Sequence, residues 1–348
     1  MSAPARVVQV GLGHPHAAGI GETLLLMPEV EIVGFCDVDP ALRGQPPPAL
    51  AARPSFADFG EMLAAVRPDV AVITLPADLT PSLVVQAAEA GVHVYAEKPV
   101  ARCAAELAPA VDAVRRAGVQ STHGYLRRFM PAGIAIERMV AQGVLGRLLS
   151  IEARWITTSV ERRGPVRFYF NRARNGGGML SWLGCHYLDF MRWVTSAEVV
   201  EVAAIAATLS ESPIDVEDVA TLALRYDNGM IGSLHCAFAT DRDTDQAFAL
   251  RGSLGSVTWD DAGPQIEARS THPSWSTAPT RVMRFEADPV PGYGGAVGVA
   301  AFRRFIAASR GQAAPVDTIE DALRVLETLD AAHESARTGR HVRVQTTR

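Results

Sequence analysis

In the first third of the chain, short apolar runs alternate with longer segments in which apolar residues recur at helical spacing. Apolar residues recur at helical spacing over 81–90 and 104–117. Around these helices lie β-branched runs typical of buried strands, at residues 6–10, 30–37, 70–73, 92–95 and 119–123. Strands that alternate with helices predict an α/β domain with a doubly wound parallel sheet.

After Gly124 the pattern changes to strands that follow one another directly. They are predicted at 148–158, 199–209, 219–226, 230–239 and 248–251. Asp227-Asn228-Gly229 predicts a tight hairpin, because Asn-Gly readily adopts positive φ at both positions. Helices are expected at 179–193, 297–309 and 319–338, and the Ser-, Thr- and Pro-rich segment 263–279 is expected to be a surface loop.

This second half is therefore expected to be an α+β domain with a large, mostly antiparallel sheet. We expect helices on one face of the sheet and nothing on the other. An uncovered apolar sheet face is usually an interface, so we expect a homodimer or homotetramer that forms through this open face.

The length of 348 residues favours two domains, which we expect at 1–124 and 125–348. With 48% hydrophobic residues, 20% charged residues and a net charge of −5, the composition is typical of a globular enzyme without affinity for nucleic acid. We find neither a signal-peptide core nor a run of about 18 apolar residues that could span a membrane. The four cysteines lack paired short spacing, which argues against a zinc site or disulfides and favours the cytoplasm.

A glycine turn after the first predicted strand carries the clearest chemical signal. Gly11 permits a tight turn, and Gly13 lets the backbone approach a diphosphate at the start of the next helix. Asp37 ends the second strand about 20 residues later, where a carboxylate can accept hydrogen bonds from both hydroxyls of an adenosine ribose. This order predicts a Rossmann dinucleotide site that favours NAD over NADP.

The residues after Gly13 depart from the usual glycine pattern. His16 occupies the third glycine position, and Pro15 is expected at the first helical position, where its missing N–H is tolerated. We still expect His14, Pro15 and His16 to contact the cofactor. We expect no metal at the two histidines, because positions i and i+2 do not share a helix face and no acidic or cysteine partner lies close by.

Four longer segments form a series along the chain. The first is AGVHVYAEKPVA at 90–101, in which Glu97-Lys98-Pro99 directly follows a predicted strand. The others are GYLRRFMP at 124–131, GGGMLSWLGCHYLDFMRW at 176–193 and APVDTIEDALRVLETLDAAHESARTGR at 314–340. Together they resemble the Gfo/Idh/MocA oxidoreductases, which are two-domain NAD(P)-dependent enzymes that act mostly on sugars and cyclitols.

The resemblance implies roles for single residues. Lys98 would hydrogen-bond the reacting oxygen, His186 would handle the hydroxyl proton, and Glu97 would help to place the nicotinamide. The alternatives without a catalytic role are a solvated surface position for Lys98 and, for His186, a half-buried helix position with a hydrogen bond to a carbonyl. Further contacts are implied to the cofactor at Thr74, Leu75, Pro76 and Arg128, and to the substrate at Tyr125 and Trp182.

The chain also departs from this family. Trp182 stands four residues before His186, where the family commonly has an aspartate, and an indole can stack on a sugar but cannot hold a hydroxyl as a carboxylate does. Ala77 and Thr80 replace an asparagine and a histidine. Three hypotheses stay open: an oxidoreductase that interconverts a secondary alcohol and a ketone on a sugar, cyclitol or sugar acid, an NAD-binding sensor without catalysis, and an enzyme that uses NAD as a transient oxidant in glycoside cleavage.

Six arginines lie between positions 154 and 174, against the single acid Glu161. Arginine binds carboxylate and phosphate in bidentate fashion, so this cluster raises the hypothesis of an anionic substrate such as a sugar acid, with Arg163 and Arg167 as its contacts. The alternative is a solvated surface, since exposed charges are the rule.

Overall fold

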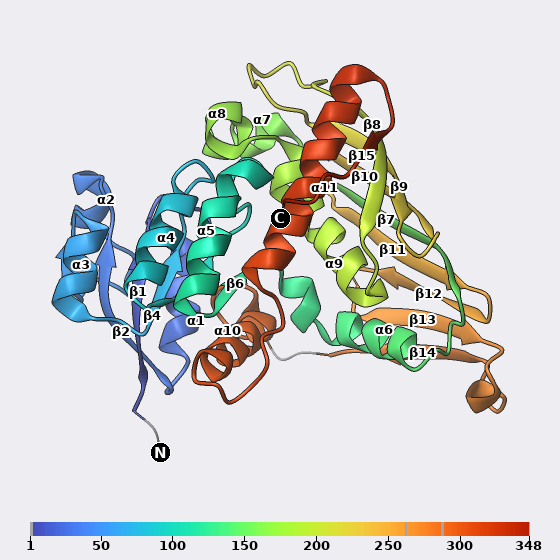
Figure 1. Cartoon of the computed structure of the whole chain (residues 1–348), viewed down its shortest axis with the longest axis horizontal. Helices are drawn as coiled ribbons and strands as arrows, with labels where there is room; N and C mark the ends of the chain where they lie inside the picture. The colour runs from blue at the N-terminus through green and yellow to red at the C-terminus, as the bar shows by residue number, and fades with distance from the viewer. Residues whose placement is uncertain (1–2, 262, 287–288, 348) are drawn as a thin grey trace. The chain divides into compact units, whose positions relative to one another are not determined.

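A computed structural model describes residues 3–261, 263–286 and 289–347, and these form two compact units. The first unit comprises Met1–Phe129 and Ala287–Leu323, and the second comprises Met130–Glu286 and Arg324–Arg348. Figure 1 follows the chain through both units.

The first unit is built on a six-stranded parallel sheet with strand order β3-β2-β1-β4-β5-β6 (Figure 1). Its strands are β1 (Ala5–Val10), β2 (Val30–Cys36), β3 (Ser55–Phe56), β4 (Val70–Ile73), β5 (His93–Ala96) and β6 (Ser121–His123). The helices between them are α1 (Ala17–Leu25), α2 (Pro40–Gly44), α3 (Phe59–Val66), α4 (Thr80–Glu89) and α5 (Ala104–Ala117). The order reverses between β1 and β4, which is where open α/β sheets bind ligands. The predicted doubly wound sheet is confirmed.

The first unit also contains a helix from far along the chain. Helix α10 (Gly295–Ser309) lies in the part that we expected to belong to the second domain. Its residues Phe302, Phe305 and Ile306 join the core formed by β1, β2 and α1, and the rings of Phe302 and Tyr95 are 4.5 Å apart. The division of the chain therefore differs from the expected cut after residue 124, because this apolar helix face completes the first core.

The second unit contains a nine-stranded sheet with strand order β14-β13-β12-β11-β7-β10-β9-β8-β15. All its pairs are antiparallel except β7 with β10. The strands are β7 (Leu148–Thr158), β8 (Val199–Ala207), β9 (Val219–Tyr226), β10 (Ile231–Thr240), β11 (Asp245–Gly252), β12 (Gly255–Asp260), β13 (Gln265–Ser270), β14 (Thr280–Arg284) and β15 (Val342–Arg343). The predicted mostly antiparallel sheet and the hairpin between β9 and β10 are confirmed. The expected positive φ at both turn positions is wrong, because Gly229 has φ of 82° but Asn228 does not adopt positive φ.

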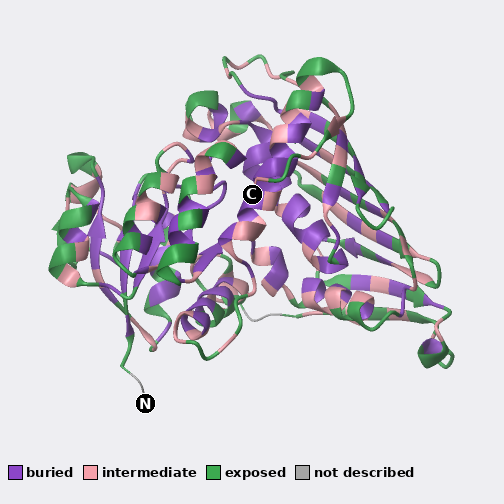
Figure 2. Ribbon diagram, viewed as in Figure 1, coloured by how far each residue is buried: buried purple, intermediate pink, exposed green. Residues whose placement is uncertain are grey.

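Several helices accompany this sheet. They are α6 (Pro131–Ala141), α7 (Val160–Arg163), α8 (Arg172–Asn175), α9 (Cys185–Thr195) and α11 (Ile319–Thr338). Helix α9 is buried along almost its whole length, whereas buried and exposed residues alternate along the strands (Figure 2). The ring of Phe190 on α9 packs against Phe248 and Trp259 of the sheet, at centroid distances of 5.0 and 5.7 Å. The sheet therefore positions α9, which carries His186.

Two other local predictions for the second half are wrong. Residues 265–270 of the segment 263–279 are not a loop, because β13 pairs with β12 and β14 on its two sides and buries Ile266, Ala268 and Ser270. The outward face of the sheet is not uniformly apolar either. It holds charged residues such as Glu152 and Arg154 beside the exposed apolar side chains of Ile205, Ile231 and Val282.

Candidate functional site

The turn after β1 has the geometry that a dinucleotide site needs. Gly11 has φ of 86°, and a Cβ at this position would lie 2.3 Å from the carbonyl oxygen of Thr74. The turn therefore requires glycine. Helix α1 begins at Ala17, so the prediction that Pro15 is its first residue is wrong. Pro15 lies in a turn before the helix, in which Ala17 donates its N–H to the His14 carbonyl and His16 donates its N–H to His14 Nδ1.

Asp37 faces this turn from the end of β2. Its Oδ2 accepts the N–H of Leu12 at 2.7 Å, and its Oδ1 accepts the N–H of Asp39 at 2.9 Å. A carboxylate has about four acceptor sites, so two bonds leave capacity for the hydroxyls of a ribose. The backbone bonds fix the direction in which the carboxylate points.

A cavity of about 180 Å³ lies beside Asp37. Its apolar wall is formed by Phe59, Leu75, Leu79 and Leu83, of which only Leu75 was predicted as a site residue. In the sequence the others look like ordinary core positions. The cavity has the mixed character of a nucleoside pocket, with apolar walls and the carboxylates of Asp37 and Asp58.

Lys98 follows β5 and is almost completely buried, at 1% exposure. The sequence left two alternatives for Lys98, a role at the site or a solvated position on the surface. Its burial excludes the surface position. The sequence holds an additional signal, since Lys98 is the only lysine of the chain. A buried lysine needs anionic or polar partners to remain charged.

Glu97 is equally buried and lies at the centre of a polar cluster. Its carboxylate accepts from the Tyr95 hydroxyl at 3.0 Å and from the Lys98 N–H at 3.3 Å, and it lies 3.3 Å from His16 Nδ1. Burial acts to raise the pKa of Glu97, but the nearby His16, His14 and Lys98 hold it well below its usual range. Glu97 is therefore an ionised carboxylate inside the protein.

The argument that no acidic partner lies near the two histidines is wrong, because the fold brings Glu97 to them. Ligand atoms of His14, His16 and Glu97 lie within 4.8 Å of one another. Hydrogen bonds account for much of this cluster, however. His14 Nδ1 accepts the backbone N–H of His16 at 3.1 Å, which leaves the proton of the neutral ring on Nε2, where a metal ion would have to bind. Burial lowers the pKa of His14 to about 3, so this ring is neutral.

The other residues of the first unit that were predicted to contact cofactor or substrate make contacts with protein groups that stabilise the fold. Thr74 donates its hydroxyl to the carbonyls of Val10 and Gly11 and holds the turn in place. Arg128 donates to the carbonyl of Val316 at 2.7 Å and pairs with Asp321 at 3.2 Å. Leu75 lies at the cavity. Tyr125 is buried, with its ring 6.3 Å from that of His123.

His186 lies near the start of α9 in the second unit and is half-buried. Its ring lies 5.6 Å from the indole of Trp155 on β7, at an interplanar angle of 40°. A π-helical turn, Leu180–Gly184, precedes α9. Glu217 Oε1 accepts the N–H groups of Gly178 and Leu180 and fixes the start of this turn. π-helical turns are frequent at functional sites.

Trp182 lies in the π-helical turn and is buried, with 4% exposure. It stacks on Tyr169 at 4.4 Å with an interplanar angle of 14°, and its ring meets that of Phe168 edge-on at 5.5 Å. One face of the indole is therefore already covered by protein. The predicted stacking of Trp182 on a sugar could use only the small part that remains accessible.

The arginines of the 154–174 segment are mostly engaged by protein groups. Arg154 pairs with Asp245, Arg162 pairs with Asp241, and Arg172 donates to the carbonyl of Asp215. Arg163 lies 4.9 Å above the ring of Phe238 and donates to the carbonyl of Thr158. Its guanidinium is thus held in a fixed direction. Arg167 is exposed and donates to the carbonyl of Arg163.

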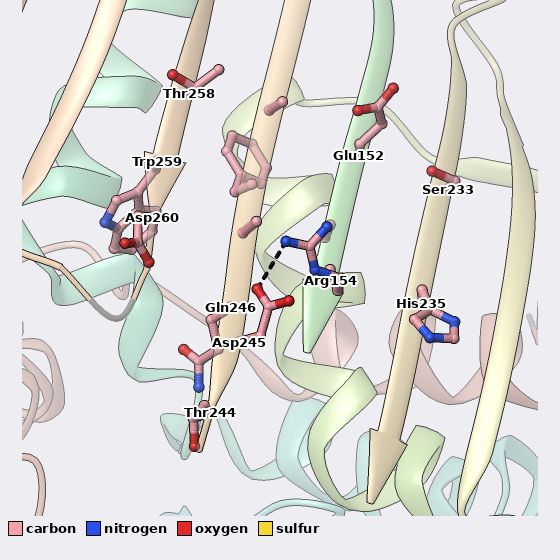
Figure 3. A pocket seen from close by; sticks show the side chains of 14 residues that line it. Glu152, Arg154, Ser233, His235, Thr244, Asp245, Gln246, Thr258, Trp259 and Asp260 are labelled. Atoms are coloured by element: carbon pink, nitrogen blue, oxygen red, sulfur yellow. Dashed lines mark hydrogen bonds and ion pairs between the residues drawn. The ribbon is translucent and has the colours of Figure 1, made fainter. Parts of the chain in front are cut away.

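A depression of about 810 Å³ lies on the open face of the sheet of the second unit (Figure 3). Glu152, Arg154, His235, Asp245 and Asp260 line it, and the dashed line in Figure 3 marks the pair of Arg154 and Asp245. None of the predicted catalytic residues lines this depression. Its broad, flat and charged floor resembles a protein contact surface more than a pocket for one sugar.

The predicted site residues thus occur in two places. Gly11, Asp37, Glu97 and Lys98 come together at the carboxyl ends of β1, β2 and β5 in the first unit. His186 belongs to the second unit, so its use together with Lys98 stays a prediction. Among the described residues, none of the helices is long and apolar enough to cross a membrane.

A parallel sheet with a glycine turn and a carboxylate after β2 defines a Rossmann-type dinucleotide-binding unit. Comparison with known proteins assigns the family. Residues 5–125 match the model of an oxidoreductase family with an NAD-binding Rossmann fold, and residues 134–258 match the Gfo/Idh/MocA C-terminal domain. The chain belongs to the Gfo/Idh/MocA family of oxidoreductases.

Relatives of the chain include dehydrogenases and reductases named for sugars and for a cyclitol. The chain is 29% identical over 328 residues to D-apiose dehydrogenase of Paraburkholderia graminis, which covers 90% of this chain and 83% of that protein. It is 26% identical over 221 residues to levoglucosan dehydrogenase of Pseudarthrobacter phenanthrenivorans, covering 55% of this chain. The match spans only 56% of that relative, and a similar match spans 62% of the oxidoreductase YrbE of Bacillus subtilis.

Solved structures share the fold over the whole chain. Levoglucosan dehydrogenase in complex with NADH and levoglucosan has a TM-score of 0.86 at 22% identity, with 99% of this chain and 100% of that chain covered. The WlbA dehydrogenase of Bordetella pertussis, in complex with NADH and UDP-GlcNAcA, has a TM-score of 0.86 at 23% identity, with 100% and 99% covered. At these identities the likeness establishes the fold.

Proposed function

We propose that the protein is an NAD-dependent oxidoreductase that interconverts a secondary alcohol and a ketone on a sugar, cyclitol or sugar acid. The observation that carries the proposal is the buried pair Glu97-Lys98 at the carboxyl edge of a Rossmann sheet, next to the glycine turn and Asp37. The names of the relatives support a carbohydrate substrate.

The residues fit a nicotinamide dinucleotide. Gly11 keeps the turn close to the sheet, Asp37 offers acceptors for a ribose, and the apolar cavity beside Asp37 suits an adenine ring. Bound there, the cofactor would supply the hydride chemistry. Lys98 would donate a hydrogen bond to the reacting oxygen and stabilise negative charge on it. His186 would accept the hydroxyl proton during oxidation and return it during reduction.

A direct spectrophotometric assay of the cofactor tests the proposal. Sugars, cyclitols and sugar acids are offered with NAD⁺ or NADH, and the absorbance of the reduced cofactor is followed. Net turnover with a carbohydrate supports the oxidoreductase. A cofactor that survives purification, together with substrate cleavage and no net NADH, would instead establish the transient-oxidant alternative. Binding of NADH without any turnover would establish a sensor, the hypothesis that Trp182 in place of a carboxylate keeps open.

Cofactor choice gives a separate prediction at Asp37. Replacing Asp37 with Ala is expected to weaken NADH binding by about 10-fold and NADPH binding much less, because the carboxylate bonds ribose hydroxyls and repels a 2′-phosphate. Fluorescence titration with both cofactors measures the ratio. Asp39→Asn is the control, since Asp39 is exposed and caps α2. An equal loss for both cofactors would mean that Asp37 acts only by holding the Leu12 N–H.

The arginine segment gives a prediction about substrate charge. Replacing Arg163 and Arg167 with Ala is expected to raise KM for sugar acids by about 10-fold while neutral sugars change little, since a guanidinium bond to a carboxylate contributes roughly 1.5–3 kcal/mol. Steady-state kinetics on matched sugar and sugar-acid pairs checks this. Arg162→Ala, which breaks an exposed pair with Asp241, is the control. Equal changes for both classes would leave only a structural role.

We also propose that two or four copies assemble through the open face of the nine-stranded sheet. Its charged depression favours a polar interface with paired charges rather than the apolar interface first expected. Mass photometry of the wild type and of Arg154→Glu would test this assembly.

A further inference from the structure

His16 lies where most dinucleotide turns have a glycine, yet its side chain has a defined set of neighbours. Its ring stacks on Tyr293 at 4.3 Å with an interplanar angle of 27°. On another side it meets the ring of His14 edge-on at 4.8 Å. Its Nδ1 lies 3.3 Å from Glu97 Oε2, and the side chain is only 24% exposed. The imidazole is therefore held between two rings and directed at one carboxylate.

The structure reserves space for Glu97 in this one position. A Cβ at Gly124 would lie 2.8 Å from Glu97 Oε2, so glycine at 124 leaves room for the carboxylate. The Tyr95 hydroxyl donates to its other oxygen, and Tyr95 itself packs on Phe302 in the core. A buried carboxylate is costly unless donors and positive charge compensate it. Here the Tyr95 hydroxyl and the Lys98 N–H donate hydrogen bonds, and His16 Nδ1 lies 3.3 Å from Oε2.

Glu97 also connects His16 to Lys98. The carboxylate accepts the backbone N–H of Lys98 and attracts its charge. Any change in the Glu97 position therefore acts on the lysine directly beside it. If His16 is removed, Oε2 loses one of its neighbours, so the carboxylate is held less firmly.

We propose that His16 is a positioning residue that sets the place of Lys98 through Glu97. The inference rests on the proposed function, in which Lys98 bonds the reacting oxygen. The substitution at the third glycine position then ties the phosphate-binding turn to the reactive end of the site. A displacement of a reacting group by about 1 Å can reduce a rate by 100-fold, so the effect belongs in kcat rather than in cofactor affinity.

Two variants separate the contributions of the ring and of its N–H. His16→Phe keeps an aromatic ring to stack on Tyr293 but has no donor for Glu97. His16→Gln keeps an N–H donor but loses the stacking. We expect His16→Phe to lower kcat by about 10- to 100-fold with NADH affinity within about threefold, and His16→Gln to restore most of kcat. His341→Phe is the matched control, because His341 and Glu201 form an exposed histidine–glutamate pair with 3.9 Å between the atoms.

A second readout does not depend on turnover. Because Lys98 is the only lysine, protein labelled with [ε-¹³C]lysine gives one lysine resonance in an NMR spectrum. We expect this resonance to move in His16→Phe and in Glu97→Gln, to return toward its wild-type position in His16→Gln, and to stay in place in His341→Phe. If His16→Phe does not fold, as judged from its thermal transition, His16→Ala removes the same donor and takes its place.

The outcomes are distinct. A lysine resonance unchanged by loss of the His16 donor overturns the inference, as does a loss of NADH affinity that accounts for the whole kinetic effect. The same holds if His16→Gln is as impaired as His16→Phe. Failure of the wild type to turn over any carbohydrate would sink the proposed function instead, and the lysine resonance would still decide whether His16 positions Lys98.

Discussion

Replacing Lys98 with Met is expected to lower kcat by about 100- to 10,000-fold while NADH affinity changes less than about threefold. Methionine fills a similar volume but cannot donate a hydrogen bond or carry charge. Lys98 is buried beside the ionised Glu97, and no other lysine exists that could take over. The reacting oxygen would lose its donor, whereas Gly11 and Asp37 would still bind the cofactor. Stopped-flow kinetics and NADH fluorescence titration measure the two effects.

The matched control is Arg102→Met, which removes a positive charge from a partly exposed pair with Glu106 close to Lys98 in the sequence. It should leave kcat within about twofold, since exposed ion pairs contribute about 0–1 kcal/mol. Thermal unfolding guards against a trivial loss, because Lys98→Met leaves a buried carboxylate with less compensation. A folded Lys98→Met variant with wild-type kcat would remove Lys98 from the chemistry.

Local patterns carried much of the fold. The helix Ala104–Ala117 and the strand Val219–Tyr226 lie at the residues that their periodicity predicted. The failures occurred where distant partners decide. The alternation of buried residues in Gln265–Ser270 is short, and only pairing with strands on both sides makes that segment a strand. The membership of α10 in the first unit depends on an apolar face that the core far away in sequence requires.

The same limit applies to the site. Gly11, Asp37 and Lys98 stand in local motifs, so the sequence alone was enough to propose them as site residues, and their roles stay predictions. The contact of His16 with Glu97 joins two motifs that periodicity treats separately. The stacking of Trp182 on Tyr169 likewise depends on how a loop folds over the π-helical turn. Neither contact has a local sequence pattern, so the sequence showed position 16 only as a departure from the usual glycine pattern.

Replacing His186 with Ala is expected to lower kcat by about 100- to 10,000-fold, because proton transfer from the substrate hydroxyl would lose its acceptor. His186 is half-buried among mostly buried residues of α9 and lies against Trp155, so the ring has a fixed direction. Added imidazole should restore part of the rate, since a small base can enter the space left by the ring. His235→Ala on the open sheet face is the control and should show neither effect.

The most stringent test of the proposed chemistry is whether Lys98 and His186 act together. If Lys98 and His186 act on the same oxygen in one step, the double variant Lys98→Met with His186→Ala should be hardly slower than the worse single variant, because groups that act as a unit lose their value together. Independent roles would instead multiply the two losses. If the two losses multiply, Lys98 and His186 serve different steps. The same follows if added imidazole restores as large a share of the rate in the double variant as in His186→Ala.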